Sequence, residues 1–333
     1  MNFPDTGRRT FIAGAAAAVA VQALPSIAAG PAGGMAGYPT KPIRLVVPFP
    51  AGQGADTSAR ALARELESVT GQTFIIDNRP GGNNVIGVKA VTNAPADGYT
   101  LFYGTNSPMA ANAVFFRSLG YDPIKDFAPV AMVVRSPWVV VVSAASPIRT
   151  FGDLVDASRR DPSAVSFATG ATGYQLAAVL LAKSSGLSIN IVPYKGTPQA
   201  LTDVIGQQVT ATMSDFGTMR PLIESGRVRP LLVFDDRRIA AIPQVPCLKD
   251  AGFNVPTLFS WTALFAAAGT PPAIVAWLAD ATRRASQTEG YKAYIAKANS
   301  EIAFAGPSEL AAFQRKEVES YRHAMKVGNV EPQ

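Results

Sequence analysis

A short apolar strand, a loop of small residues and a helix follow one another over residues 45–71, and this order most constrains the fold. Residues 45–47 are apolar and predict a buried strand. Prolines and the small-residue loop 51–55 end this strand. Apolar residues then recur at helical spacing as far as Gly71, where a glycine in the left-handed conformation is expected to end the helix. The order indicates an α/β protein, and the free amides of the helix start favour an anion.

The loop lacks the patterns that mark nucleotide sites. No Gly-x-x-x-x-Gly-Lys-Ser/Thr is present, and the glycines at 52 and 54 have no third partner at dinucleotide-binding spacing. An ordinary strand-to-helix turn remains the alternative to an anion site. We expect Asp56 to be the helix N-cap, because its carboxylate accepts from first-turn amides, and a direct role in ligand binding stays open.

Composition excludes several function classes. The chain has 333 residues and a net charge of +6, and it contains no basic run, which disfavours nucleic-acid binding and suits small anions. The single cysteine, Cys247, cannot form an intramolecular disulfide, and we expect it to be inert packing. The single histidine, His323, is expected on the surface. Ser–His–Asp catalysis needs a histidine inside a site, and most zinc sites need several histidines or cysteines, so we expect neither this catalysis nor a metal or cofactor.

The N-terminus predicts an export signal. Arg8 and Arg9 precede an apolar, Ala-rich run and then small residues, which is typical of a twin-arginine signal peptide. A membrane anchor is disfavoured because the apolar run, residues 13–24, is shorter than the roughly 20 residues a span requires. We therefore assign residues 1–37 to a signal and linker and expect the protein in the periplasm.

Strands and helices alternate along the rest of the chain. Expected strands cover residues 74–76, 99–103, 139–142, 165–168, 191–192, 209–213 and 231–234, with helices between them and two more near the C-terminus. This alternation predicts mainly parallel sheets with ligands at the carboxyl ends of the strands. The ends at 48–56 and 104–107 are expected side by side, and the architecture recurs after residue 146, giving two α/β lobes.

An ordered set of motifs spans most of the chain. The set comprises residues 48–56, 78–82, 86–87, 96–101, 192–196, 206–209, 225–229, 242–246, 251–253 and 267–271. In this order the chain resembles the Bug family, the extracytoplasmic solute receptors of tripartite tricarboxylate transporters. The resemblance implies a type II periplasmic-binding-protein fold, in which two α/β lobes joined by a two-strand hinge close on a small carboxylate through backbone amides and waters.

The resemblance also implies an organisation and a role. It places the first lobe at 38–140 plus 262–333 and the second at 141–261. The implied role is delivery of a carboxylate to membrane permease subunits by a monomeric, non-enzymatic receptor. Two alternatives stay open: a solute sensor that signals to a membrane kinase, and an exported α/β enzyme acting on small acids, which the lack of a nucleophile–base pair disfavours.

Small-residue loops at the strand ends supply the candidate ligand-binding residues. They are Phe49, Pro50, Ala51, Gly52, Gln53, Gly54, Ala55, Asp56, Gly104, Thr105, Asn106, Thr169, Gly170, Ala171, Thr172, Gly173, Tyr174, Lys195, Gly196 and Asp215. The sequence departs from the family pattern at Gln53, where a small residue is usual, at Asn83-Asn84 and at residues 173–175. Gln53 is expected either to reach the ligand or to narrow the cleft.

Several of these residues have a structural alternative. Thr169 and Thr172 precede a helix and suit ordinary capping as well as carboxylate binding. Lys195 either attracts the anion or lies on the surface. Asp215 fits the organiser of a loop better than a ligand group. Tyr194 and Trp261 either wall the cleft or pack in the core.

Overall fold

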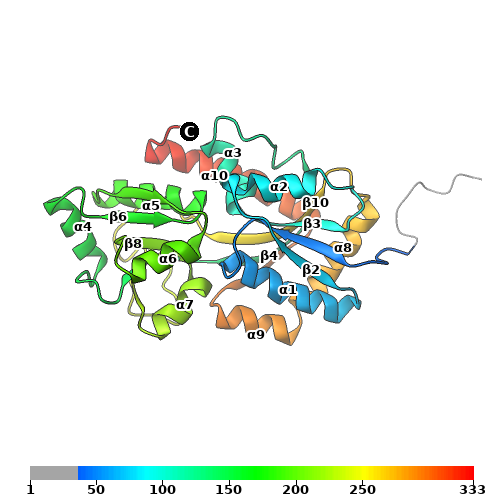
Figure 1. The fold of residues 1–333 in the computed structure, drawn as a ribbon, viewed down its shortest axis with the longest axis horizontal. Helices are drawn as coiled ribbons and strands as arrows, with labels where there is room; N and C mark the ends of the chain where they lie inside the picture. Colours follow the sequence, from blue (N-terminus) through cyan, green and yellow to red (C-terminus); the bar gives the residue numbers. More distant parts are fainter. Residues whose placement is uncertain (1–36) are drawn as a thin grey trace, which may run out of the picture. The chain divides into compact units, whose positions relative to one another are not determined.

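The alternating strands and helices build two sheets (Figure 1). This computed structural model describes residues 37–333, so the predicted signal lies outside the described residues except for Gly37. The first sheet has the order β11-β4-β10-β3-β1-β2. Its strands are β1 (Ile43–Val47), β2 (Phe74–Asn78), β3 (Thr100–Thr105), β4 (Phe127–Ser136), β10 (Ser260–Ala267) and β11 (Glu301–Ala305).

Helices cover both faces of the first sheet. Strand β1 alternates, with Ile43, Leu45 and Val47 packed against one helical layer and Val46 against the other. The first layer contains α1 (Gly54–Thr70), α8 (Pro272–Ser286) and α9 (Glu289–Lys297). The second contains η1 (Gly82–Asn84), α2 (Val85–Thr92), η2 (Ser107–Ala111), α3 (Asn112–Phe115) and α10 (Pro307–Gly328). We call this sheet with its helices the first lobe.

The second sheet has the order β7-β6-β8-β5-β9. Its strands are β5 (Trp138–Ser143), β6 (Ser166–Thr169), β7 (Asn190–Pro193), β8 (Ala211–Asp215) and β9 (Val228–Phe234). One face packs against α4 (Phe151–Arg160) and α5 (Thr172–Ser185), and the other against α6 (Thr197–Ile205) and α7 (Phe216–Glu224). This second lobe completes the predicted two-lobe α/β fold, while the lobe boundaries at residues 140/141 and 261/262 stay predictions.

The prediction of mainly parallel sheets is wrong. Five of the nine strand pairings within residues 37–333 are antiparallel. The reason is the path between the lobes: β4 leads through Pro137 into β5, and β10 returns to the first sheet between β3 and β4, against both. The parallel part is confirmed for β1, β2 and β3, so the strand ends 48–56 and 104–107 do lie side by side.

The two crossing points between the lobes are bonded to each other. The Trp138 indole donates to the Ser260 hydroxyl at 2.6 Å, and Arg135 pairs with Asp235 at 3.1 Å while its guanidinium lies 4.2 Å from the centre of the Phe259 ring. These contacts join the strand leaving the first lobe to the segment that returns from the second. They define a short hinge region whose segments are joined by a hydrogen bond, an ion pair and a cation–π contact.

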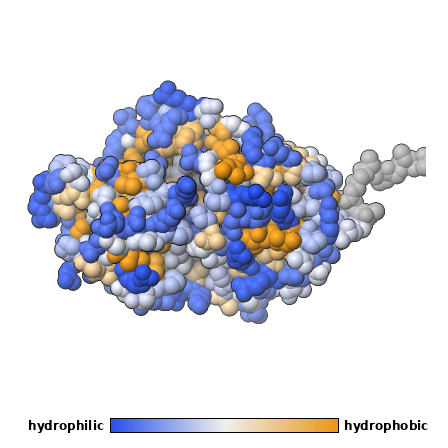
Figure 2. Space-filling model, viewed as in Figure 1, coloured by the Kyte–Doolittle hydropathy of each residue, from blue (hydrophilic) through white to orange (hydrophobic). Residues whose placement is uncertain are grey.

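The single cysteine and the single histidine, for which no chemical role is expected, lie where the sequence predicts. Cys247 is buried beside β9, and His323 is exposed on α10. Among residues 37–333 the long exposed apolar side chains are Ile75, Ile86 and Val327. Figure 2 shows hydrophilic residues over much of the face drawn, with separate hydrophobic groups between them. No helix in this part of the chain has the length and apolarity to span a bilayer.

Candidate functional site

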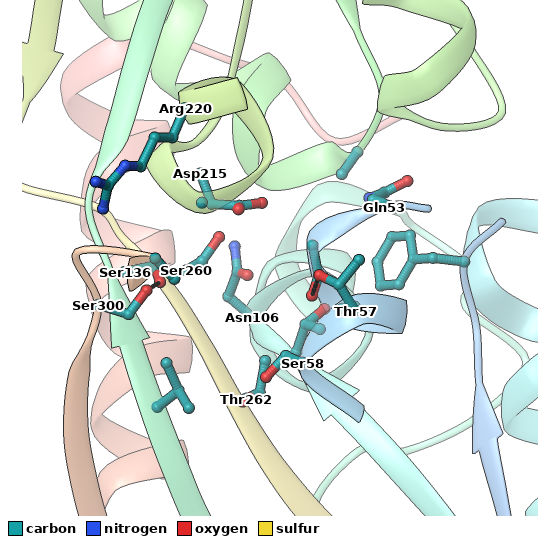
Figure 3. Close-up of a pocket in the computed structure, with 18 of the residues that line it drawn as sticks. Gln53, Thr57, Ser58, Asn106, Ser136, Asp215, Arg220, Ser260, Thr262 and Ser300 are labelled. Atoms are coloured by element: carbon teal, nitrogen blue, oxygen red, sulfur yellow. Dashed lines mark hydrogen bonds between the residues drawn. The ribbon is translucent and has the colours of Figure 1, made fainter. Parts of the chain in front are cut away.

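A cavity of about 300 Å³ lies between the lobes, where β1, β3 and β8 end (Figure 3). Segments from both sheets form its wall, so neither lobe makes it alone. The lining side chains with hydrogen-bonding groups are Gln53, Thr57, Ser58, Thr105, Asn106, Ser107, Ser136, Tyr174, Asp215, Arg220, Glu224, Ser260, Thr262, Tyr294, Lys297 and Ser300. Polar groups that converge from distant segments on one concave space are typical of a ligand site.

Helix α1 presents free backbone amides at this wall. Gly54 and Ala55 line the cavity, and within residues 37–333 no group accepts a hydrogen bond from either N–H. Helices α5 and α7 also begin at the cavity, with Ala171 and Asp215 as their N-caps. Helix N-termini carry partial positive charge, so those of α1 and α5 favour a negatively charged ligand, whereas the Asp215 carboxylate already caps α7.

Asp56 has a different place from the one predicted. Gln53 is the N-cap of α1, and Asp56 lies in the first turn, where its carboxylate accepts from the Gly52 amide at 2.9 Å and from Arg60 and Asn78. Burial would raise the pKa of Asp56, but these hydrogen bonds together lower it. Asp56 therefore fixes the loop shape and does not line the cavity.

The end of β3 contributes one side chain without a partner. Thr105 is 6% exposed and lines the cavity, and its hydroxyl makes no hydrogen bond to any described residue. The neighbouring Asn106 amide donates to the Tyr321 hydroxyl at 2.8 Å, which fixes its orientation in the wall. A buried hydroxyl without a partner is costly, so the Thr105 group lacks a compensating hydrogen bond in this structure.

The second lobe contributes a buried carboxylate. Asp215 Oδ1 accepts from the amide and hydroxyl of Thr218 at 3.0 and 2.9 Å, which caps α7. Asp215 Oδ2 accepts longer bonds, at 3.3 Å, from the Tyr174 and Ser214 hydroxyls. Burial, followed by the negative charge of Asp215, raises the pKa of Tyr174, so this phenol remains a neutral donor.

Gln53 connects the lobes. Its side-chain Oε1 accepts from the Thr197 amide at the start of α6, at 3.2 Å, and both residues are buried. The close approach requires glycine at position 196, because a Cβ there would lie 2.7 Å from Gln53 Oε1. Ser107 adds a second contact between lobes by accepting from the Gly173 amide at 3.2 Å. Gln53 therefore bonds the two lobes to each other beside the cavity, and its contact with a ligand stays a prediction.

The end of the cavity away from Gln53 is lined by serine hydroxyls and by Arg220 (Figure 3). Ser136 and Ser260 come from the crossing strands, and Ser136 is hydrogen-bonded to Ser300. Arg220 on α7 pairs with Glu224 at 2.6 Å and also donates to the Lys297 carbonyl in the first lobe. Contacts between lobes therefore flank the cavity at both ends, through Gln53 on one side and Arg220 on the other.

Comparison with known proteins agrees with this geometry. Residues 58–328 match the model of the tripartite tricarboxylate transporter family receptor, TctC. The chain belongs to this family. It is 32% identical over 287 residues to Protein BugT of Bordetella pertussis, which covers 85% of this chain and 88% of that protein. The predicted family is confirmed.

Solved structures extend the comparison to the whole fold. An R. palustris protein solved with adipate has a TM-score of 0.85 and 30% identity, covering 89% of this chain and 100% of its own. MatC from Rhodopseudomonas palustris, solved with bound malate, has a TM-score of 0.80 and 26% identity, covering 86% and 99%. The periplasmic binding protein BugD has a TM-score of 0.84 and 26% identity, covering 89% and 100%. This receptor therefore has the two-lobe fold of periplasmic binding proteins.

The receptor brings about half of the predicted site residues together at the 300 Å³ cavity. They come from three predicted loops and from the end of β8. These residues are Phe49, Gln53, Gly54, Ala55, Thr105, Asn106, Ala171, Tyr174 and Asp215. Their common location supports the sequence-based site, although their contacts with a ligand stay predictions.

A second cavity, of about 630 Å³, is lined by another group of the predicted residues. Thr169, Gly170, Thr172 and Lys195 line it, together with Phe49 and Ala171, which also line the first. Tyr194 lies here as well, with its hydroxyl bonded to Asp203 at 2.6 Å. Lys195 is exposed on this side. Thr169, Thr172, Tyr194 and Lys195 therefore do not line the 300 Å³ cavity.

The remaining predicted residues line neither cavity. They are Pro50, Ala51, Gly52, Asp56, Gly104, Gly173 and Gly196, which shape the loops or allow the lobes to approach. The alternative that Trp261 walls the cleft is wrong. Its ring is fully buried in the core, and its indole donates to Glu317 at 2.9 Å.

Several lining residues were missed in the sequence. They are Thr57 and Ser58 on α1, Ser136, Ser260 and Thr262 on the crossing strands, Arg220 on α7, and residues near the C-terminal end of α9. None of these lies in a small-residue loop that follows a strand. The serines at 136 and 260 flank the crossing points, so the predicted two-strand hinge is the signal that points to them.

Proposed function

We propose that this receptor binds a small carboxylate in the 300 Å³ cavity and delivers it to the permease of a tripartite tricarboxylate transporter. The observation that carries the proposal is that Gly54 and Ala55, whose amides have no acceptor, and Thr105, whose hydroxyl has no hydrogen-bond partner among residues 37–333, all line the same cavity. Relatives solved with adipate and malate support the same ligand class. Lobe closure around the ligand would present a distinct surface to the permease.

The cavity offers enough binding free energy without an unpaired arginine. Hydrogen bonds from amides and hydroxyls to a charged group contribute roughly 1.5–3 kcal/mol each, so four of them give about 6–12 kcal/mol before losses. Immobilisation offsets part of that sum, and binding in the micromolar range, about −8 kcal/mol, remains. The small cavity volume restricts the ligand to the size of a central metabolite.

A thermal-shift screen over mono-, di- and tricarboxylates tests the proposal. A ligand at 100 times its dissociation constant stabilises the folded state by about 2.7 kcal/mol, which raises the melting temperature. Thr105→Val should remove most of the shift. Thr92→Val is the matched control, since the Thr92 hydroxyl is also buried without a partner but does not line the cavity. An absence of shift with every carboxylate would contradict the proposal.

Export completes the proposed role. The Arg8-Arg9 pair and the apolar run behind it support transport by the twin-arginine route to the periplasm. Replacing both arginines with lysines should leave the protein in the cytoplasm, as measured by cell fractionation. Unchanged periplasmic yield would contradict the route while leaving the receptor function intact.

Delivery and sensing use the same closed pair of lobes, so genetics must separate them. Deleting the gene should abolish uptake of the ligand identified in the screen. Loss of a transcriptional response with unchanged uptake would instead support a sensor that acts on a membrane kinase. Turnover of a carboxylate by the pure protein would support an enzyme.

A further inference from the structure

A chain of buried hydroxyl groups links the cavity wall to the contact between the lobes. The Thr197 amide donates to Gln53 of the first lobe, and the Thr197 hydroxyl lies 3.4 Å from the Ser214 hydroxyl. Ser214 in turn donates to the Tyr174 hydroxyl at 3.2 Å, and Tyr174 lines the 300 Å³ cavity. Thr197 and Ser214 are fully buried and line neither cavity. Side chains of β8, α5 and the start of α6 therefore form one polar path.

The buried carboxylate of Asp215 gives this path a direction. Each hydroxyl has one proton to donate, and a carboxylate only accepts. Tyr174 donates to Asp215 Oδ2 at 3.3 Å, so its oxygen is free to accept. The Ser214 proton goes either to Tyr174 or to the same carboxylate oxygen, and in both arrangements the Ser214 oxygen can accept from Thr197. Hydrogen bonds that point the same way polarise one another, so the path is expected to act as a unit.

The same path reaches the hinge region through Ser260. The Ser260 hydroxyl accepts from the Trp138 indole and lies 3.4 Å from the Tyr174 hydroxyl. The Tyr174 ring also packs edge-on against Trp138, with the ring centres 4.9 Å apart. Tyr174 therefore stands where the cavity, the hinge region and the path to Gln53 meet.

We propose that Tyr174 and Ser214 are positioning residues for closure, which couple occupation of the cavity to the Gln53–Thr197 bond between the lobes. A ligand in the cavity fixes the Tyr174 hydroxyl. Ser214 then holds the Thr197 side chain, and with it the start of α6, where the Thr197 amide meets Gln53. The inference rests on the proposed function because it needs a ligand in this cavity, but it does not depend on which carboxylate binds.

Calorimetric titration of the purified protein tests this coupling. Malate and adipate, with which two relatives were solved, are the first probes. Ser214→Ala interrupts the path without changing the cavity wall, so it should weaken binding by about 2- to 12-fold, the range for one neutral hydrogen bond. Ser143→Ala is the matched control, because this buried serine of the same sheet donates to the Ile205 carbonyl at 3.2 Å, away from the cavity. Its affinity should equal that of wild type.

A double-mutant cycle separates coupling from a merely structural role. Gln53→Ala combined with Ser214→Ala should weaken binding no more than the stronger single variant, because both break the same unit. The fold-changes of independent residues would multiply instead. Tyr174→Phe keeps the ring against Trp138 and should give the same result with Gln53→Ala. It takes the place of Ser214→Ala in the cycle if that variant does not fold.

The outcomes distinguish this inference from the proposed function. Wild-type affinity in Ser214→Ala, or multiplied fold-changes in the double variants, would overturn the coupling and leave the carboxylate receptor intact. If neither malate nor adipate nor any other carboxylate of the screen binds the wild-type protein, the proposed function fails, and the inference fails with it.

Discussion

Gln53 shows how one side chain changes a common loop. It is the N-cap of α1 by position, yet its side chain makes no capping bond and instead accepts from the Thr197 amide of the other lobe. A glutamine at this position therefore stabilises the closed arrangement of the lobes rather than the helix. The family resemblance marked it as a departure, and the structure shows its contact.

Replacing Gln53 with alanine tests that role. The variant should weaken ligand binding by about 2- to 12-fold, the range expected for one neutral hydrogen bond, and its melting temperature should change little. Calorimetric titration with the ligand from the screen measures the effect. Gln199→Ala, an exposed glutamine on α6, is the control. Wild-type affinity in Gln53→Ala would show that the bond does not hold the closed state.

Asp56 gives a pH prediction. Hydrogen bonds from Arg60, Gly52 and Asn78 outweigh burial and lower its pKa from the usual 3.8. A carboxylate with a lowered pKa in the folded state stabilises that state above its unfolded pKa, and the contribution is lost as the pH falls through the lowered value. Asp56→Asn should therefore lose less stability than wild type between pH 5 and pH 2, with urea denaturation as the measurement. Parallel pH profiles would contradict this.

At the scale of elements, the start of α1 combines two requirements. Its amides must remain free, and its first residue must be small enough to approach Asp215. Glycine at position 54 meets the second requirement because it has no side chain. Alanine has a higher helix propensity than glycine. The presence of glycine at position 54 therefore indicates that the close approach of the two lobes takes priority over the stability of the helix.

Gly54→Ala should therefore impair closure. The added methyl group would overlap the Asp215 carboxylate, so ligand affinity should fall by roughly 10-fold, while the ligand-free protein should be as stable as wild type or slightly more stable. Titration and thermal melts measure both quantities. Gly152→Ala, in the first turn of α4 with space for a methyl group, is the matched control. Unchanged affinity would contradict the close approach.

Local pattern predicted the elements better than it predicted their pairing. Prolines, glycines and apolar spacing located β1, α1, β2 and β3, because these signals act within a few residues. Strand direction for β4, β5 and β10 depends on how the chain crosses between lobes, which no local pattern records. Ser136 and Ser260 lie in the strands that cross between the lobes and Arg220 lies within α7, so the site prediction did not include them, whereas Gln53, Asn106 and Asp215 lie at the loops that follow β1, β3 and β8.

At the scale of the whole molecule, the cavity depends on the two lobes together. The crossing strands carry Ser136 and Ser260 in the cavity wall, and Arg135 with Asp235 braces the region where the chain passes between lobes. The Gln53–Thr197 and Arg220–Lys297 contacts join the lobes at opposite ends of the cavity. We therefore predict that binding and closure are one event, in which a ligand between the lobes adds contacts that only the closed state has.

The most direct test is a crystal structure of the protein with the carboxylate that gives the largest thermal shift. We predict density in the 300 Å³ cavity, with a ligand carboxylate accepting from the Gly54 and Ala55 amides and within hydrogen-bonding distance of Thr105. The lobes should be closed, with Gln53 bonded to Thr197. A ligand in the second cavity, or on the surface with the Gly54 and Ala55 amides still unoccupied, would contradict binding at the start of α1.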